Sequence, residues 1–151
     1  MDIGIKEWIY LIGLIVTFVT FSLKLNADRA ATKYRETISF LEKRDERQNE
    51  IWMEIKQISS ESTNQHLLPK EKVNAFFSQL ELVALLIKRG AFDDEIVYSQ
   101  WWYFYYQPRQ KIGLITWLSI CRDSDKKVFQ HYIDLCDKWK DRIEAEQSGI
   151  P

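Results

Sequence analysis

The segment NADRAATKYRETISFLEKRDERQNEIWMEIKQI, Asn26 to Ile58, sets the architecture of this chain. It contains neither proline nor glycine, and a seam of positions recurs in alternating steps of four and three residues. This pattern predicts one continuous helix, which forms either a coiled coil or an amphipathic helix packed along its own domain. The seam residues are Ala27, Ala31, Tyr34, Ile38, Leu41, Asp45, Gln48, Trp52 and Ile55.

Two polar residues interrupt the seam. Asp45 and Gln48 lie within the charged run EKRDERQNE, where an apolar residue would stabilise a coiled coil. Polar seam residues weaken a coiled coil and can fix its register. We therefore interpret residues 26–58 as a helical stalk with a possible coiled coil, and the charged run itself as a solvated helix face.

An uncharged run, WIYLIGLIVTFVTFSL, precedes the stalk from Trp8 to Leu23. As a helix it covers about 24 Å, somewhat less than the hydrocarbon core of a bilayer, which is about 30 Å thick. Lys24 can extend its ammonium group outward, and Trp8 and Tyr10 suit the membrane interface. We expect residues 1–25 to be a membrane anchor that enters the lipid bilayer through Trp8 to Leu23.

The charges on either side of this run predict its orientation. A cleaved signal peptide fits poorly. Such a peptide begins with a positively charged segment, and here Asp2 and Glu7 add negative charge to it. Positive charge gathers after the run rather than before it, which favours a single pass with the C-terminal part in the bacterial cytoplasm, at the inner membrane. The basic residues that follow are Lys24, Arg29, Lys33 and Arg35, and Lys6 precedes.

Composition excludes several classes of protein. The chain has 151 residues and a formal net charge of −1, and no basic stripe is visible, so nucleic acid is not an expected partner. Cys121 and Cys136 lack the paired spacing of a zinc site or the density of a disulfide framework. We interpret both as reduced thiols in the core, which agrees with a cytoplasmic location.

Beyond the stalk the sequence predicts an all-α domain. SSESTNQHLLPK, residues 59–70, is a linker rich in helix-breaking residues, and we expect its His66 to be incidental. Residues 71–146 carry four amphipathic segments with short connections, which predict an antiparallel four-helix bundle, and residues 147–151 form a tail. The first segment is expected between Pro69 and Gly90, and the second between Asp93 or Asp94 and Pro108. The third is expected from Arg109 to Asp123, and the fourth from Ser124 to Ile143.

The second of these segments contains SQWWYFYYQ, Ser99 to Gln107, with six consecutive aromatic residues. Successive helical residues advance by about 100°, so six of them surround the axis and cannot all face one core. Two interpretations stay open, a core element or a protein-contact surface. Trp102, Tyr103 and Tyr106 are the residues that we expect at a partner-binding surface.

Catalytic and ligand-binding patterns are weak throughout. There is no phosphate-binding glycine loop, nucleophile elbow or HExxH motif, and we expect no catalytic residue, cofactor or metal site. Glu81 borders an apolar stripe, where a structural hydrogen bond or a buried ion pair with Arg109 or Arg122 is the favoured reading. His131, with Asp134 three residues on, offers too few ligands for a metal.

The sequence FFSQLELVALLIKRGAFDDEIVYSQWW, Phe76 to Trp102, resembles a family of uncharacterised small bacterial membrane-anchored proteins. In that family an E-x-hydrophobic-A helix and a G-x-x-D-E turn lead into an aromatic helix. The resemblance implies a single membrane span followed by a cytoplasmic helical domain, and it brings no established activity. The residues that carry it are Glu81, Ala84, Gly90, Asp94, Glu95 and Trp101.

These observations favour a membrane-anchored interaction or scaffold protein without catalysis of its own. Its expected partners are another protein or further copies of the same chain. The alternative is an effector that perturbs membranes by oligomerisation, in phage defence or superinfection exclusion.

Overall fold

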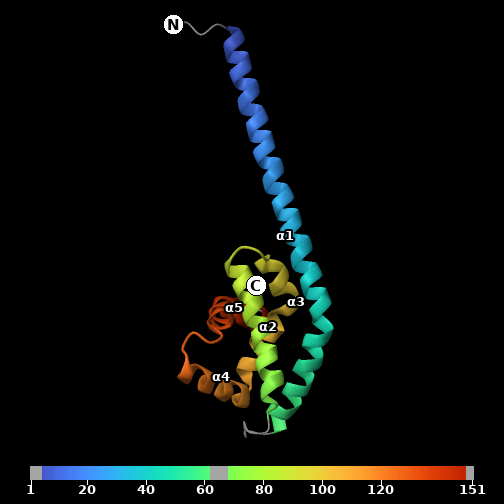
Figure 1. The fold of residues 1–151 in the computed structure, drawn as a ribbon, viewed down its shortest axis with the longest axis vertical. Helices are drawn as coiled ribbons and strands as arrows, with labels where there is room; N and C mark the ends of the chain where they lie inside the picture. Colours follow the sequence, from blue (N-terminus) through green and yellow to red (C-terminus); the bar gives the residue numbers. More distant parts are fainter. Residues whose placement is uncertain (1–4, 62–67, 149–151) are drawn as a thin grey trace.

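The computed structural model describes residues 5–61 and 68–148, with side chains for residues 12–58 and 68–148. In these residues the chain consists of helices joined by short connections, without a strand (Figure 1). The elements are α1 (Ile5–Glu61), α2 (Lys70–Lys88), α3 (Asp94–Tyr106), the short 3₁₀ helix η2 (Gln107–Gln110), α4 (Ile112–Ser124) and α5 (Gln130–Ser148). The predicted all-α class is confirmed.

Helix α1 is unbroken over 57 residues, a length of about 85 Å. Its first part projects away from the other helices, and its second part runs beside α2 and α3 (Figure 1). We call residues 12–36 the projecting part, whose side chains are nearly all exposed, and residues 37–58 the docked part. The boundary lies at Thr37, whose side chain is completely buried.

The docked part is one wall of the hydrophobic core. Leu41, Trp52 and Ile55 are buried, and the Trp52 indole stacks on the Phe76 ring of α2 at 5.5 Å between centroids. Of the two arrangements that the seam left open, these residues therefore adopt the amphipathic helix packed along its own domain. The core extends beyond the predicted bundle at residues 71–146, because the docked part of α1 contributes to it.

The predicted membrane anchor receives no support from the described residues. Among them, no helix combines the length and the apolar character that a membrane crossing requires. The predicted run begins at Trp8, and the side chains of Trp8 and Tyr10 lie outside the described residues, as does His66 of the linker.

Local chemistry explains the turn between α2 and α3. Gly90 has φ +73°, a left-handed conformation that favours glycine, and the N–H of Ala91 bonds to the Leu86 carbonyl at 2.9 Å to close α2. The Asp93 carboxylate then accepts hydrogen bonds from the N–H groups of Glu95 and Ile96 at the start of α3. The predicted Gly90 turn is confirmed, and of the two candidates Asp93 and Asp94, Asp93 is the cap.

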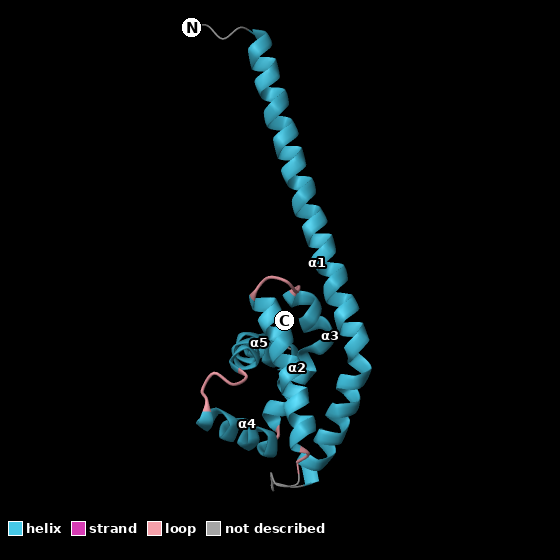
Figure 2. Cartoon of the chain, in the orientation of Figure 1, coloured by secondary structure: helices cyan, strands magenta, loops and turns pink. Residues whose placement is uncertain are grey.

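The last two helices depart from the predicted bundle. The fourth segment was expected from Ser124, but α5 begins at Gln130, because Phe129 takes a left-handed backbone (φ 54°) and buries its ring against Trp117 at 5.8 Å. Figure 2 shows α5 nearly end-on while α2 runs lengthwise, so the two helices cross instead of lying antiparallel. Large rings fill this crossing, since Phe77 of α2 meets Tyr132 of α5 at 5.1 Å.

The docked part of α1 should contribute strongly to stability. We expect Trp52→Ala to lower the free energy of unfolding by about 3–5 kcal/mol, because it leaves a cavity against Phe76. Met53→Ala, one residue along and 62% exposed, should change it by less than about 0.5 kcal/mol. Urea denaturation of both variants measures the difference, and equal small losses would contradict the docking of α1.

Candidate functional site

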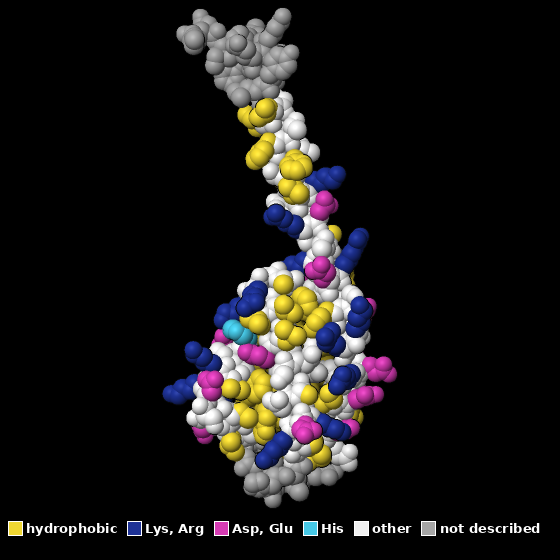
Figure 3. All heavy atoms as spheres, in the orientation of Figure 1, with side chains coloured by type: hydrophobic (Ala, Val, Ile, Leu, Met, Phe, Trp, Pro, Cys, Tyr) yellow, Lys and Arg dark blue, Asp and Glu magenta, His cyan; other side chains and the backbone are white. Residues whose placement is uncertain are grey.

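The projecting part of α1 carries an apolar surface that no other helix covers. Side chains from Ile12 to Phe21 are all exposed, including Leu14 and Phe18 at 69% each. Four successive exposed residues already surround a helix axis, so no face of this segment is covered by the described protein. Figure 3 shows the apolar side chains beside the grey end, and the first charged residues lie closer to the helical domain.

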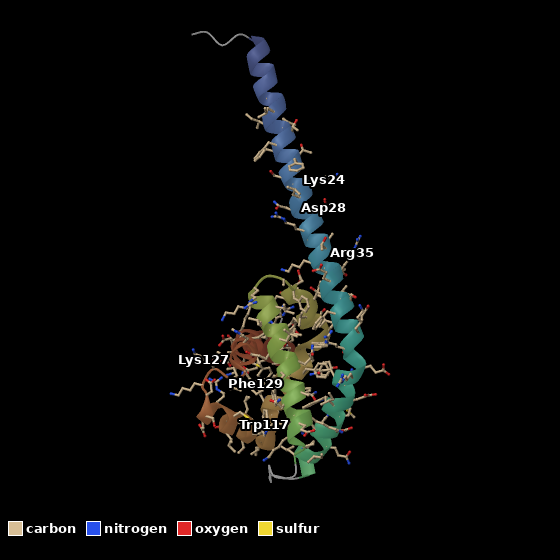
Figure 4. The ribbon with its side chains drawn as sticks, in the orientation of Figure 1. Lys24, Asp28, Arg35, Trp117, Lys127 and Phe129 are labelled. Atoms are coloured by element: carbon tan, nitrogen blue, oxygen red, sulfur yellow. The ribbon has the colours of Figure 1, made fainter. Side chains whose placement is uncertain are left out.

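Charged residues begin abruptly after this apolar surface. Lys24 is exposed, and Asp28 and Arg35 extend from the same helix before it reaches the domain (Figure 4). The structure thus places Lys24 at the boundary between an apolar and a charged length of one helix. Its predicted place at a membrane interface stays a prediction.

The aromatic helix α3 turns one side into the core. Trp101, Phe104 and Tyr105 are completely buried. Their polar tips are satisfied, because the Trp101 indole N–H donates to Asp45 Oδ1 at 3.0 Å and the Tyr105 hydroxyl donates to the Leu80 carbonyl at 2.9 Å. Burial raises the pKa of the Tyr105 phenol well above its ordinary value. These three residues are structural.

The three residues predicted to bind a partner lie on the outer side of α3. Trp102, Tyr103 and Tyr106 are half-buried, and the Trp102 ring lies 6.4 Å from that of Tyr103 and 6.2 Å from that of Tyr106. Tyr103 is also anchored, since its hydroxyl donates to Asn49 Oδ1 at 2.7 Å. Burial, with a smaller contribution from the Asp45 carboxylate, raises the pKa of Tyr103 to about 12. We call Trp102, Tyr103 and Tyr106 the aromatic patch.

An acidic surface adjoins the aromatic patch. A hollow of about 600 Å³ beside Tyr103 is lined by Glu42, Asp45 and Glu46 of α1 and by Gln100 of α3. We call these three carboxylates the acidic rim. Aromatic rings beside carboxylates offer apolar contact area together with acceptors for basic side chains.

Glu81 makes structural hydrogen bonds, one of its two predicted roles, in place of the ion pair with Arg109 or Arg122. Its carboxylate is half-buried and accepts hydrogen bonds from the backbone N–H groups of His131 at 3.1 Å and Tyr132 at 2.7 Å. Phe129, at the residue before α5, has no side-chain acceptor, so Glu81 of α2 supplies the cap from outside and meets the helix dipole with negative charge. Arg109 instead pairs with Asp137, and Arg122 contacts Gln130 and the Val128 carbonyl.

Two acidic residues at the start of α3 join it to α5. Asp94 accepts a hydrogen bond from the Trp139 indole at 3.1 Å and pairs with Lys138. Glu95 accepts from the Arg142 guanidinium through both oxygens, at 2.8 and 2.9 Å. Together with Glu81, these contacts show that the acidic residues carrying the family resemblance hold helices together.

The thiols and His131 form no reactive cluster. Burial raises the pKa of Cys136 to about 12, and its Sγ lies 3.3 Å from the Tyr105 carbonyl. Burial also raises the pKa of Cys121. His131 Nδ1 lies 3.4 Å from the Lys88 ammonium. In the described parts of the chain, no three His, Cys, Asp or Glu side chains are grouped as metal ligands.

Comparison with known proteins gives a family and no activity. The sequence from residue 8 to residue 139 matches the family described as a domain of unknown function, DUF4760. The chain belongs to the DUF4760 family. No curated protein and no solved structure matches it. The DUF4760 match begins at Trp8 and reaches Trp139, so the family unit includes the apolar length of α1 as well as the helical domain.

Sequence reasoning missed one feature of this DUF4760 domain, a basic groove between α1 and α2. Lys43, Arg44 and Arg47 line it from α1, and Gln79 lines it from α2. The charged run on α1 had been interpreted as a solvated face. The signal that was available is that Asp45 and Gln48 lie in the seam, which places the cations beside them at the edge of an interface.

The Glu81 cap can be tested by graded substitution. We expect Glu81→Ala to lower the free energy of unfolding by about 1–3 kcal/mol, because two N–H groups of α5 lose their acceptors. Glu81→Gln should lose less, since it keeps one acceptor oxygen but not the charge. Glu50→Ala, at an exposed position of α1, is the control. Chemical denaturation measures all three, and an unchanged Glu81→Ala variant would contradict the cap.

Proposed function

We propose that this DUF4760 protein is a single-pass membrane-anchored interaction protein without catalysis of its own. The apolar length of α1 enters the lipid bilayer of the bacterial inner membrane, and the helical domain lies on the cytoplasmic side. The observation that carries the proposal is the uncovered apolar surface of the projecting part. An exposed apolar surface of this extent on a soluble monomer is rare and marks a membrane or protein contact.

The proposed span also requires residues that precede Ile12, the first residue whose side chain the structure describes. The described apolar residues start at Ile12 and alone are too short for a span. The sequence adds Trp8 to Leu11, also uncharged, and the run to Leu23 covers about 24 Å. Interfacial Trp8 and Tyr10 at one end and the extended Lys24 side chain at the other make up the difference.

The helix itself supports the orientation and the spacing. The basic residues concentrated between Lys24 and Arg35 favour the cytoplasm for the domain. Because α1 continues without a break, the distance from Leu25 to Thr37 is about 18 Å. The domain therefore stands close to the membrane on a rigid connection.

The aromatic patch and the acidic rim are the proposed partner surface. Trp102 and Tyr106 supply half-buried rings of the type that commonly anchors protein contacts. The carboxylates of Glu42 and Glu46 are exposed beside Tyr103, the third residue of the aromatic patch, and favour a partner segment that carries Lys or Arg. The partner is another protein or a second copy of the chain.

Membrane insertion can be tested with charge substitutions. We expect the full chain to stay in the membrane pellet after alkaline carbonate washing, whereas Ile15→Arg combined with Val19→Arg should shift most of it to the supernatant. Each arginine near the centre of the bilayer costs about 2.5–3.5 kcal/mol on insertion scales. Tyr34→Arg is the matched control, because Tyr34 is exposed beyond the apolar run.

Loss of the chain from the pellet in both variants, or in neither, would contradict the proposed anchor. Protease added to inverted membrane vesicles should digest the helical domain, and protease added to intact spheroplasts should not. Loss of membrane potential on expression would instead support the effector hypothesis.

The partner surface has its own test. We expect the Trp102→Ala and Tyr106→Ala double variant to lose the crosslinked species that the full chain forms in cells, because both rings leave the contact. Tyr103 is left unchanged in this variant, because its hydroxyl donates a hydrogen bond to Asn49 within the domain. Ile112→Ala with Ile115→Ala on α4, both exposed, is the control. A species that survives in the first variant and disappears in the control would place the contact on α4.

A further inference from the structure

A basic groove lies between α1 and α2, apart from the aromatic patch and the projecting part of α1. Its volume is about 400 Å³, within the usual range for small-molecule sites. Lys43, Arg44 and Arg47 line it from α1, together with Gln48 and Ile51, and α2 contributes Gln79.

In the described parts of the chain, no carboxylate pairs with the three cations of the groove. Several other cations of the domain are paired, as Arg109 is with Asp137 and Arg142 with Glu95. Within residues 12–58 and 68–148, no ion pair joins Lys43, Arg44 or Arg47 to an acidic side chain. The groove is therefore locally positive.

One of these cations is held in place. The Arg44 guanidinium carbon lies 4.0 Å from the centre of the Phe40 ring, an arrangement in which the ring face attracts the cation. Arg44 is half-buried, whereas Lys43 and Arg47 are exposed. The groove thus combines a positioned guanidinium with two adjustable cations.

The polar groups along the groove are incompletely bonded. The Gln48 side chain is buried, with an exposed fraction of 3%. Its amide makes one long hydrogen bond, from Nε2 to the Phe76 carbonyl at 3.4 Å. Gln79 Nε2 is buried and has no hydrogen-bond partner in the described protein. A buried N–H donor without an acceptor destabilises the fold. A ligand that supplied an acceptor to this amide would remove that cost.

We propose that this groove binds a small molecule that carries a phosphate or diphosphate group. Guanidinium groups match phosphate oxygens through two parallel N–H donors, and the Lys43 ammonium and the Gln79 amide add further donors. Ile51 gives an apolar wall for the remainder of the ligand. This site is independent of the membrane anchor and of the partner surface.

The charge distribution favours a small anion over a long polyanion. Glu42, Glu46 and Glu50 are exposed on the same turns of α1 as the three cations. A nucleic acid strand that extended beyond the groove would meet these carboxylates. A compact phosphate-bearing ligand fits between the cations without reaching them.

Calorimetric titration of the purified full chain in detergent tests the site, with pyrophosphate and ADP as the probes. We expect saturable one-to-one binding of both at low ionic strength, weakening as salt is added. Arg44→Gln with Arg47→Gln should reduce the affinity at least tenfold, and Arg47→Gln alone should reduce it less. Lys126→Gln with Lys127→Gln, which removes two exposed cations far from the groove, should leave the affinity unchanged.

Gln79→Leu separates binding from folding. It should raise the thermal midpoint of the ligand-free chain, because an unsatisfied buried donor is removed, and it should weaken the binding of both probes. Absence of saturable binding to either probe overturns the proposal. Binding that survives the loss of both arginines, or that the Lys126 and Lys127 control lowers equally, also overturns it. Tighter binding of a single-stranded oligonucleotide than of ADP would overturn the assignment to a small molecule.

Discussion

The continuity of α1 is the constraint on which the rest of the structure depends. From Asn26 to Ile58 the sequence offers no glycine or proline at which the helix could bend sharply or end. The docked part is fixed in the core by Trp52 and Ile55, so the projecting part must leave the domain as a direct continuation of the same helix. The positions of the apolar surface and of the helical domain relative to each other follow from this one element.

The same helix accounts for the crowded aromatic residues of α3. Six consecutive rings cannot share one core face, and α3 turns them toward α1, α2 and α5 and toward its outer side. The indole of Trp101 needs an acceptor, which Asp45 provides, and the hydroxyl of Tyr103 finds Asn49 one turn further along. The polar interruption that weakened the seam as a coiled coil is therefore what α3 requires.

Sequence patterns predicted the features that depend on neighbouring residues. The Gly90 turn and the Asp93 cap follow from local backbone chemistry, and the apolar spacing of α2 follows from helical periodicity. The docking of α1 and the crossing of α5 depend on contacts between residues far apart in the chain. Glu81 shows why these were missed, because its partners are backbone N–H groups about fifty residues away, and no side-chain pattern reports them.

Two surfaces of the domain share the same turns of α1. Arg44, Arg47 and Gln48 face the groove toward α2, whereas Asp45 and Asn49 bond to the aromatic helix α3. These residues alternate along about two turns, so any rotation of α1 that opened one side would strain the hydrogen bonds on the other. Since the helix continues without a break into the projecting part, such a rotation would also turn that part about its axis. The groove, the aromatic patch and the apolar surface are therefore all joined through one continuous helix.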